Sequence, residues 1–241
     1  MLEIMVLSGM AGLATVVGAL IILAFGKPSE KNLAIFFGLA AGIMLSVALL
    51  DLVPSSVSYG SYNSLLTGSL FGLVLLKILS FILQPDKLPS STRGEIYLRR
   101  MGYLIAIGIA LHDLPEGIAI AAGFSATVNL GWKIGVAIGL HNIPEGMIAA
   151  APLLMSGLPP GSILFILGIV SLFTPLGTLL GLLIVSLSRT YISFLLAMAA
   201  GAMIYIVLFE IIPESKKRHP NYARLGMVLG FLLIFFLRFI E

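Results

Sequence analysis

Apolar residues fill eight long stretches of this 241-residue chain, and short polar breaks separate them. A helix needs about 20 mostly apolar residues to cross a membrane. Within lipid, only helices and closed barrels satisfy all their backbone hydrogen bonds. Only 10% of the residues are charged, against roughly a quarter in soluble domains. We therefore expect an all-α membrane protein with spans at residues 2–25, 33–57, 63–83, 101–124, 131–155, 162–187, 190–213 and 222–240.

The basic residues of the breaks predict how these spans are oriented. Lysine and arginine concentrate in alternate breaks, including the polar segment 84–100, whereas the second, fourth and sixth breaks hold only Lys133 and Arg189. Because such residues favour the cytoplasmic side, we expect a cytoplasmic loop at 84–100 and both termini outside the cytoplasm. The chain would then be a multi-pass protein of the cell membrane. The same distribution argues against nucleic acid as a partner, since the basic residues mark topology in the lipid bilayer.

Two of the predicted spans share a sequence pattern. AAGIMLSVALLDLVP begins at Ala40 and AAGAMIYIVLFEIIP begins at Ala199, so Asp51 and Glu210 occupy matching positions. Since the second and seventh spans run in opposite directions, we predict an inverted repeat, spans 1–3 against 6–8, around central spans 4 and 5. Asp51 would then line an access route from the outer face, and Glu210 a route to the inner face. The alternative is that both acids are hydrated near helix ends.

The segments HDLPEG (residues 112–117) and HNIPEG (residues 141–146) lie near the middle of the fourth and fifth spans. A His and a Glu four residues apart share one helix face, and a short connection makes the two spans antiparallel neighbours. Pro115 and Pro144 each remove a helical hydrogen bond, so we expect kinks beside the histidines. A charged side chain at the bilayer centre costs about 2.5 to 3.5 kcal/mol. A bound cation is the simplest compensation for several of them.

Imidazole nitrogen with carboxylate oxygen suits zinc, ferrous iron, manganese or cobalt. The sequence has no cysteine, which excludes thiolate sites and argues against a copper(I) carrier. Because imidazole must be neutral to bind metal, loading should weaken in acid. An intramembrane zinc-dependent hydrolase is the alternative, although four protein ligands leave little room for an activated water. We favour transport without enzymatic activity, with the metal as cargo and no separate cofactor.

The paired motifs in the fourth and fifth of eight spans resemble those of the ZIP (Zrt/Irt-like) divalent metal transporters, and the resemblance covers essentially the whole chain. It implies movement of divalent metal, zinc above all, toward the cytoplasm. It also implies a homodimer and an elevator-like movement of the helices that carry the site.

The resemblance further implies which residues bind metal. The primary site of the family maps onto His112, Glu116, His141 and Glu145, with Met44 as a weaker candidate ligand. Its neighbouring second site maps onto Asp113 and Asn142. Many relatives carry a glutamate immediately before the proline of the sixth span, where this sequence has Thr174 before Pro175. Since a hydroxyl replaces a carboxylate there, we expect one dominant metal position.

Overall fold

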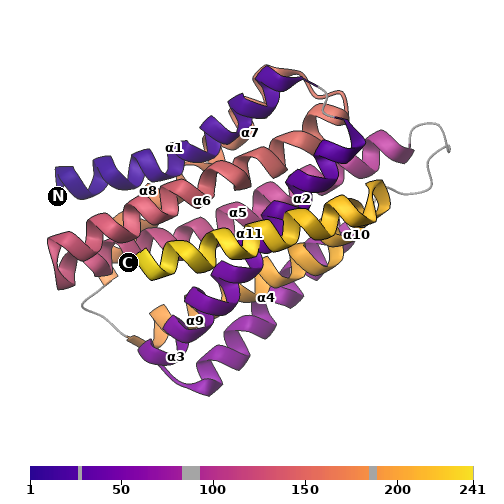
Figure 1. The fold of residues 1–241 in the computed structure, drawn as a ribbon. Coiled ribbons are helices and arrows are strands. Elements are labelled where there is room, and N and C mark those ends of the chain that lie inside the picture. Colours follow the sequence, from indigo (N-terminus) through magenta and orange to yellow (C-terminus); the bar gives the residue numbers. More distant parts are fainter. Residues whose placement is uncertain (27–28, 83–92, 185–188, 241) are drawn as a thin grey trace.

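The computed structural model describes residues 1–26, 29–82, 93–184 and 189–240. Within those ranges the regular elements are helices: α1 (Leu2–Phe25), α2 (Glu30–Ser46), η1 (Val47–Leu52), α3 (Val53–Tyr59), α4 (Tyr62–Ile82), α5 (Arg93–Ala126), α6 (Val128–Met155), α7 (Pro160–Val170), α8 (Phe173–Ile184), α9 (Arg189–Ile206), η2 (Val207–Ile211), α10 (Ile212–Arg218) and α11 (Pro220–Ile240). The helices lie roughly along one direction, and α1 begins at the end of the bundle where α11 ends (Figure 1).

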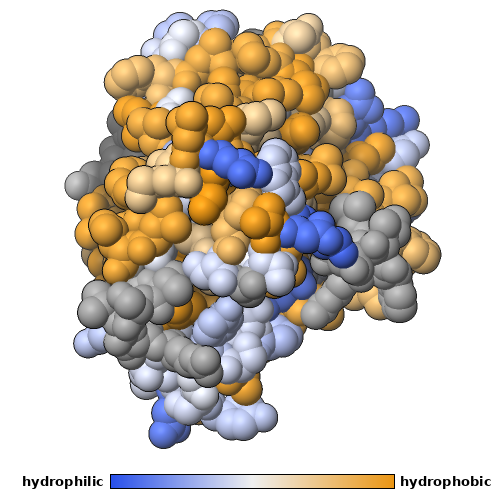
Figure 2. Space-filling view, turned by 90° about the vertical axis from the view of Figure 1, so that its left-hand side faces the viewer, coloured by the Kyte–Doolittle hydropathy of each residue, from blue (hydrophilic) through white to orange (hydrophobic). Residues whose placement is uncertain are grey.

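Seven helical segments of the described chain are long and apolar enough to cross a membrane, and α11 contains a shorter apolar stretch, Pro220–Phe236. Large apolar side chains on the outside remain exposed, among them Leu66, Phe81, Phe165 and Phe236. Figure 2 views the bundle from the end where α1 begins, and apolar residues cover much of that view and its flanks. An apolar exterior suits lipid rather than water, so the predicted all-α membrane class is confirmed.

The first turns of α5 differ from the sequence expectation. α5 begins at Arg93, inside the segment 84–100 that we expected to be a loop. Residues 83–92 of that segment lie outside the described chain. Two arginines anchor the early turns, because Arg99 donates to Ser156 O at 3.0 Å and Arg100 donates to Ser80 O at 3.1 Å. The polar residues 93–100, which precede the predicted span, thus form the first turns of the same helix, α5.

The sixth predicted span is two helices instead of one. α7 ends at Val170 and α8 starts at Phe173, with a turn at residues 171–172. Pro175 explains the break, because it cannot donate to the carbonyl of Ser171 four residues earlier and its ring crowds that oxygen. The freed Ser171 carbonyl packs against Gly12 of α1, where a methyl group would overlap it.

Two π-helical segments interrupt the second and seventh spans. η1 contains Asp51 and η2 contains Glu210, and each segment is followed within three residues by a proline, Pro54 or Pro213. A widened π turn relieves the clash between a proline ring and the carbonyl one turn back. α5 and α6 remain helical through Pro115 and Pro144, without a π turn at either proline, and the kinks expected there stay a prediction. The interruptions instead mark the two acids that the repeat singled out.

Close backbone contacts join the helices in pairs, α1 with α6, α5 with α8, α2 with α11 and α4 with α9. At Gly146, Gly117, Gly230 and Gly72, a methyl group would overlap a backbone carbonyl of the partner helix. Glycine allows this approach, as in other tightly packed membrane helices. α5 packs against α6, which brings α1, α5, α6, α7 and α8 together. We name these five helices the motif bundle, and α2, η1, α3, α4, α9, η2, α10 and α11 the flanking bundle.

Candidate metal site

The two motif histidines pair crosswise with the glutamates of the opposite helix. His112 Nε2 on α5 lies 2.8 Å from Glu145 Oε2 on α6. His141 Nε2 on α6 lies 3.0 Å from Glu116 Oε1 on α5. His112 and Glu145 are fully buried, and Glu116 and His141 are nearly so. The structure therefore brings together all four side chains of the primary site predicted from the sequence.

The contacts of His112 show how its ring would bind a cation. Its Nδ1 lies 2.9 Å from Gly108 O. A carbonyl can only accept, so Nδ1 carries the proton, and Nε2 is the nitrogen that can bind metal. Without metal, a proton must lie between Nε2 and Glu145 Oε2 for the two atoms to hydrogen-bond. A metal ion bound there replaces that proton, so binding and proton release are coupled.

Several buried oxygens around the motifs have no hydrogen-bond partner in the described chain. They are Asp113 Oδ1 and Oδ2, Glu116 Oε2, Glu145 Oε1, Asn142 Oδ1, Thr15 Oγ1 and Thr174 Oγ1. A buried polar atom that lacks a partner costs about 1 to 3 kcal/mol, and more when it is charged. Donor atoms around a tetrahedral zinc, each about 2.0 to 2.2 Å from the ion, lie about 3.3 Å apart. The nitrogen and oxygen atoms of each His–Glu pair would therefore have to move apart only slightly to admit such an ion.

Asp113 lies closer to the primary ligands than its assignment to a second site suggested. Ligand atoms of His112, Asp113 and Glu116 all lie within 4.8 Å of one another. Asp113 is fully buried, and its Oδ1 is 3.6 Å from His112 Nε2. Asn142 differs, because its side-chain nitrogen donates to Ala11 O on α1 at 3.0 Å. Asp113 thus adds a further carboxyl group beside the paired motifs, whereas Asn142 also ties α6 to α1.

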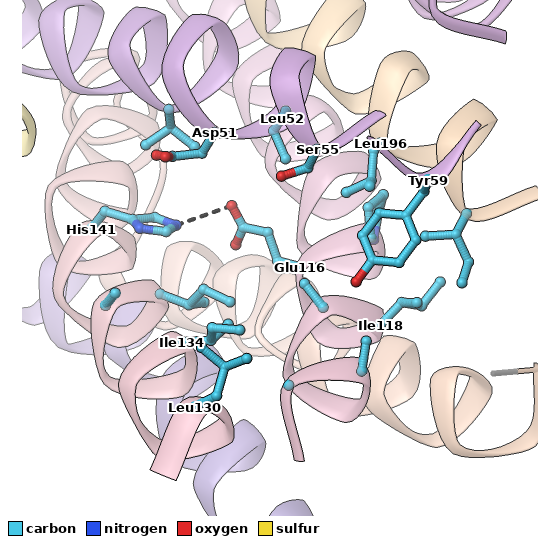
Figure 3. Close-up of a pocket in the computed structure, with 18 of the residues that line it drawn as sticks. Asp51, Leu52, Ser55, Tyr59, Glu116, Ile118, Leu130, Ile134, His141 and Leu196 are labelled. Carbon is cyan, nitrogen blue, oxygen red and sulfur yellow. Dashed lines mark hydrogen bonds and ion pairs between the residues drawn. The ribbon is translucent and has the colours of Figure 1, made fainter. Parts of the chain in front are cut away.

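A cavity of about 330 Å³ leads to one side of the paired motifs. Asp51, Glu116 and His141 line it, together with mostly apolar side chains of η1, α3, α5, α6, α9 and α11. Figure 3 shows Glu116 and His141 pointing toward each other, with Asp51 beside His141 and Tyr59 farther along the cavity. The structure therefore places Asp51, predicted to line an access route, in a cavity shared with two motif residues.

Glu210 lies on the opposite side of the two motifs from this cavity. Other side chains of the same chain contact its carboxylate. Arg100 Nη2 lies 3.3 Å from Glu210 Oε1, and Ser80 Oγ donates to the same oxygen at 3.4 Å. Arg100 also donates to the backbone oxygen and the hydroxyl of Ser80. Glu210, the acid predicted to line the second route, thus forms an ion pair with Arg100. The sequence analysis did not predict this pairing.

Met44 and Thr174 were the remaining residues of interest from the sequence. Met44 is fully buried on α2 in the main hydrophobic cluster. Packing accounts for that position, and its role as a ligand stays a prediction. Thr174 is fully buried on α8, and its backbone oxygen packs against Gly117 of the first motif.

Sequence reasoning missed Thr15, although a signal for it exists. Thr15 is the α1 counterpart of Thr174, because its backbone oxygen packs against Gly146 of the second motif. Thr15 precedes Thr174 by the same number of residues that separates Ala40 from Ala199. Extending the repeat beyond its AAG segments would have found this residue.

Comparison with known proteins agrees with this geometry. The family described as ZIP zinc transporter matches residues 86–238. The zinc transporter ZupT of Escherichia fergusonii is 31% identical over 229 residues, which cover 90% of this chain and 88% of that protein. A ZupT zinc transporter of Escherichia coli is 32% identical over 248 residues, covering 95% of each chain. The chain therefore belongs to the ZIP family of zinc transporters.

Proposed function

We propose that this protein carries divalent transition-metal ions, zinc foremost, across the cell membrane toward the cytoplasm. The observation that carries the proposal is the crosswise pairing of His112 with Glu145 and of His141 with Glu116, buried between two membrane helices. Membership of a zinc transporter family and similarity to ZupT zinc transporters support the same cargo. The intramembrane hydrolase is not favoured, since these relatives are named as transporters.

The metal ligands in this proposal are His112, Glu116, His141 and Glu145. Asp113 adds a carboxyl group close to His112 and Glu116, and Met44 and Asn142 complete the candidate set. Thr174 supplies a neutral hydroxyl where many relatives offer a carboxylate. We therefore infer one dominant metal position between α5 and α6.

We also propose that the fold contains the inverted repeat predicted from the sequence. Ser56 Oγ donates to Ser193 O at 2.9 Å, and Ser215 Oγ donates to Ala34 O at 2.8 Å. Ser56 corresponds to Ser215 and Ala34 corresponds to Ser193, because each pair has the same separation along the chain as Ala40 and Ala199. Thr15 and Thr174 match in the same way, because the backbone oxygen of each packs against the glycine of one motif. Paired repeats of this kind support movement of one part of a transporter against another.

The orientation proposed here follows the basic residues. Lys216, Lys217 and Arg218 end α10, at the end of the molecule where α5 begins, and basic residues favour the cytoplasm. The cavity with Asp51 then opens toward the outside, and Glu210 lies toward the cytoplasm. Both termini lie outside the cytoplasm in this arrangement. The homodimer that the resemblance implies is part of the same proposal.

Metal uptake into proteoliposomes tests the proposed function. Vesicles with the purified chain should take up zinc with saturable kinetics, and excess cadmium, ferrous iron, manganese or cobalt should compete in proportion to affinity. Vesicles of the same lipid without protein measure the leak. Uptake that rises linearly with zinc and equals the leak at every concentration would refute the proposal.

A further inference from the structure

Arg100 joins the two bundles through a network of hydrogen bonds. It lies on α5 of the motif bundle, and both of its partners, Ser80 on α4 and Glu210 on η2, lie in the flanking bundle. Its Nη2 is 3.3 Å from Glu210 Oε1, and its Nη1 is 3.5 Å from Glu210 Oε2. Nε and Nη2 both donate to Ser80 O, at 3.3 Å and 3.1 Å. The guanidinium is thus held by three acceptor groups of one bundle while its backbone belongs to the other.

This network lies on the opposite side of the motifs from the cavity. The α5 residues that line the cavity begin at Pro115, after His112 in the sequence. Arg100 precedes His112 by twelve residues, about 18 Å along an α-helix. The Arg100 and Glu210 side chains are only 10% and 5% exposed. One side of the candidate metal site is therefore hollow, and a buried ion pair lies on the other.

The charges of the network matter for a cation that leaves on this side. Glu210 is the acid predicted to line the release route, and Arg100 occupies it. A guanidinium repels a divalent cation, and the desolvated pair is screened weakly. While Arg100 contacts both oxygens of Glu210, its positive charge opposes the binding of a cation there. The two bundles also cannot slide past each other at this point until the arginine is released.

We propose that Arg100 acts as a latch of the transport cycle. It holds the motif bundle against Ser80 and Glu210, keeps the end opposite the cavity closed, and must leave Glu210 before cargo can exit there. This inference rests on the proposed function for its place in transport. Arg100 is a positioning residue in this account, because it acts through the two bundles and not as a ligand of the primary site.

The latch can be tested without metal by following the access of a thiol reagent. The chain has no cysteine, so one introduced cysteine is the only reactive thiol. Leu76 on α4 is fully buried one turn before Ser80, about 6 Å deeper along the helix. Leu76→Cys in lipid nanodiscs, treated with a charged maleimide, therefore reports opening of the end that Arg100 closes.

Removing the latch should expose this reporter. We expect Arg100→Gln to raise the labelling rate of Leu76→Cys about tenfold, because hydrogen bonds to charged groups then no longer favour the closed end. Ser80→Ala should raise it less, since it removes only the hydroxyl of the network. Arg99→Gln is the matched control, because Arg99 donates to Ser156 O of its own bundle. Glu95→Cys, exposed in the early part of α5, controls for reagent reactivity.

The outcomes separate the latch from the proposed function. A rate in Arg100→Gln within twofold of the unsubstituted reporter, or an equal rise in Arg99→Gln, would overturn the latch. If Arg100→Gln does not give a monodisperse protein, Ser80→Ala decides, and an unchanged rate in that variant overturns the proposal. Labelling requires no metal. If the chain fails to take up zinc but Arg100→Gln raises the labelling rate of Leu76→Cys, the proposed cargo alone is refuted. If the chain takes up zinc but Arg100→Gln leaves the labelling rate of Leu76→Cys unchanged, the latch alone is refuted.

Discussion

Replacing His141 by alanine is expected to reduce zinc uptake into proteoliposomes to the level of protein-free vesicles. The substitution removes one of two imidazole ligands and leaves Glu116 without its partner at 3.0 Å. Losing an outer-shell partner of a metal ligand already costs about 10- to 100-fold in affinity or activity, and losing the ligand itself should cost more. At micromolar zinc, the initial uptake rate should therefore be indistinguishable from the leak.

The sequence offers a matched control for this substitution. Of the three histidines, His219 lies between α10 and α11 and its ring contacts Tyr222 at a centroid distance of 4.6 Å. His219→Ala should leave zinc uptake unchanged. Normal uptake by His141→Ala, with equal amounts of reconstituted protein, would remove the site from the transport route.

Replacing Gly146 by alanine is expected to destabilise the protein and slow transport together. The added methyl group would overlap the backbone oxygen of Thr15 on α1. A backbone atom cannot rotate away as a side chain can, so α1 and α6 must separate, and overpacking of this kind costs about 1 to 3 kcal/mol. Thermal unfolding of purified protein in detergent, followed by Trp132 fluorescence, should shift down by several degrees. Zinc uptake should fall because α6 carries His141 and Glu145.

Gly168→Ala provides the comparison for that experiment. Gly168 also lies within a helix, α7, but no heavy atom lies near the position of an added methyl group. Alanine forms helices better than glycine, so this variant should unfold at the same temperature as the unsubstituted chain or slightly higher. Equal unfolding temperatures for the two glycine variants would contradict the close contact between α1 and α6.

The membrane class and the paired motifs could be predicted from the sequence because both depend on strong local signals. Apolar length alone determines whether a helix can span lipid. The four-residue spacing of His112 and Glu116 places both on one helix face, and the short connection between α5 and α6 makes the helices antiparallel. These constraints suffice to bring four side chains together. The crosswise pairing, in contrast, depends on how far α5 slides along α6, which spacing within one motif does not determine.

Other features depend on contacts between distant segments and were missed for that reason. The hydropathy of residues 93–100 indicates a polar loop. Arg99 and Arg100, however, donate to acceptors just after α6, on α4 and on η2, and these contacts stabilise a helix there. The sequence places a proline after each of Asp51 and Glu210, yet it does not reveal that π turns form before them. The prolines inside α5 and α6 leave both helices continuous, so a proline alone does not predict where a helix changes to a π turn or ends.

The position of a bound cation is the most direct test of the central claim, that the two motifs form one metal site. Crystals soaked in cadmium and measured at a wavelength where cadmium scatters anomalously would locate the ion without assumptions about its ligands. The account predicts one dominant peak between α5 and α6, within coordination distance of His112, Glu116, His141 and Glu145. A strongest peak that touches none of these four side chains would contradict it, and two equally occupied ions bridged by Glu116 or Glu145 would contradict the single position.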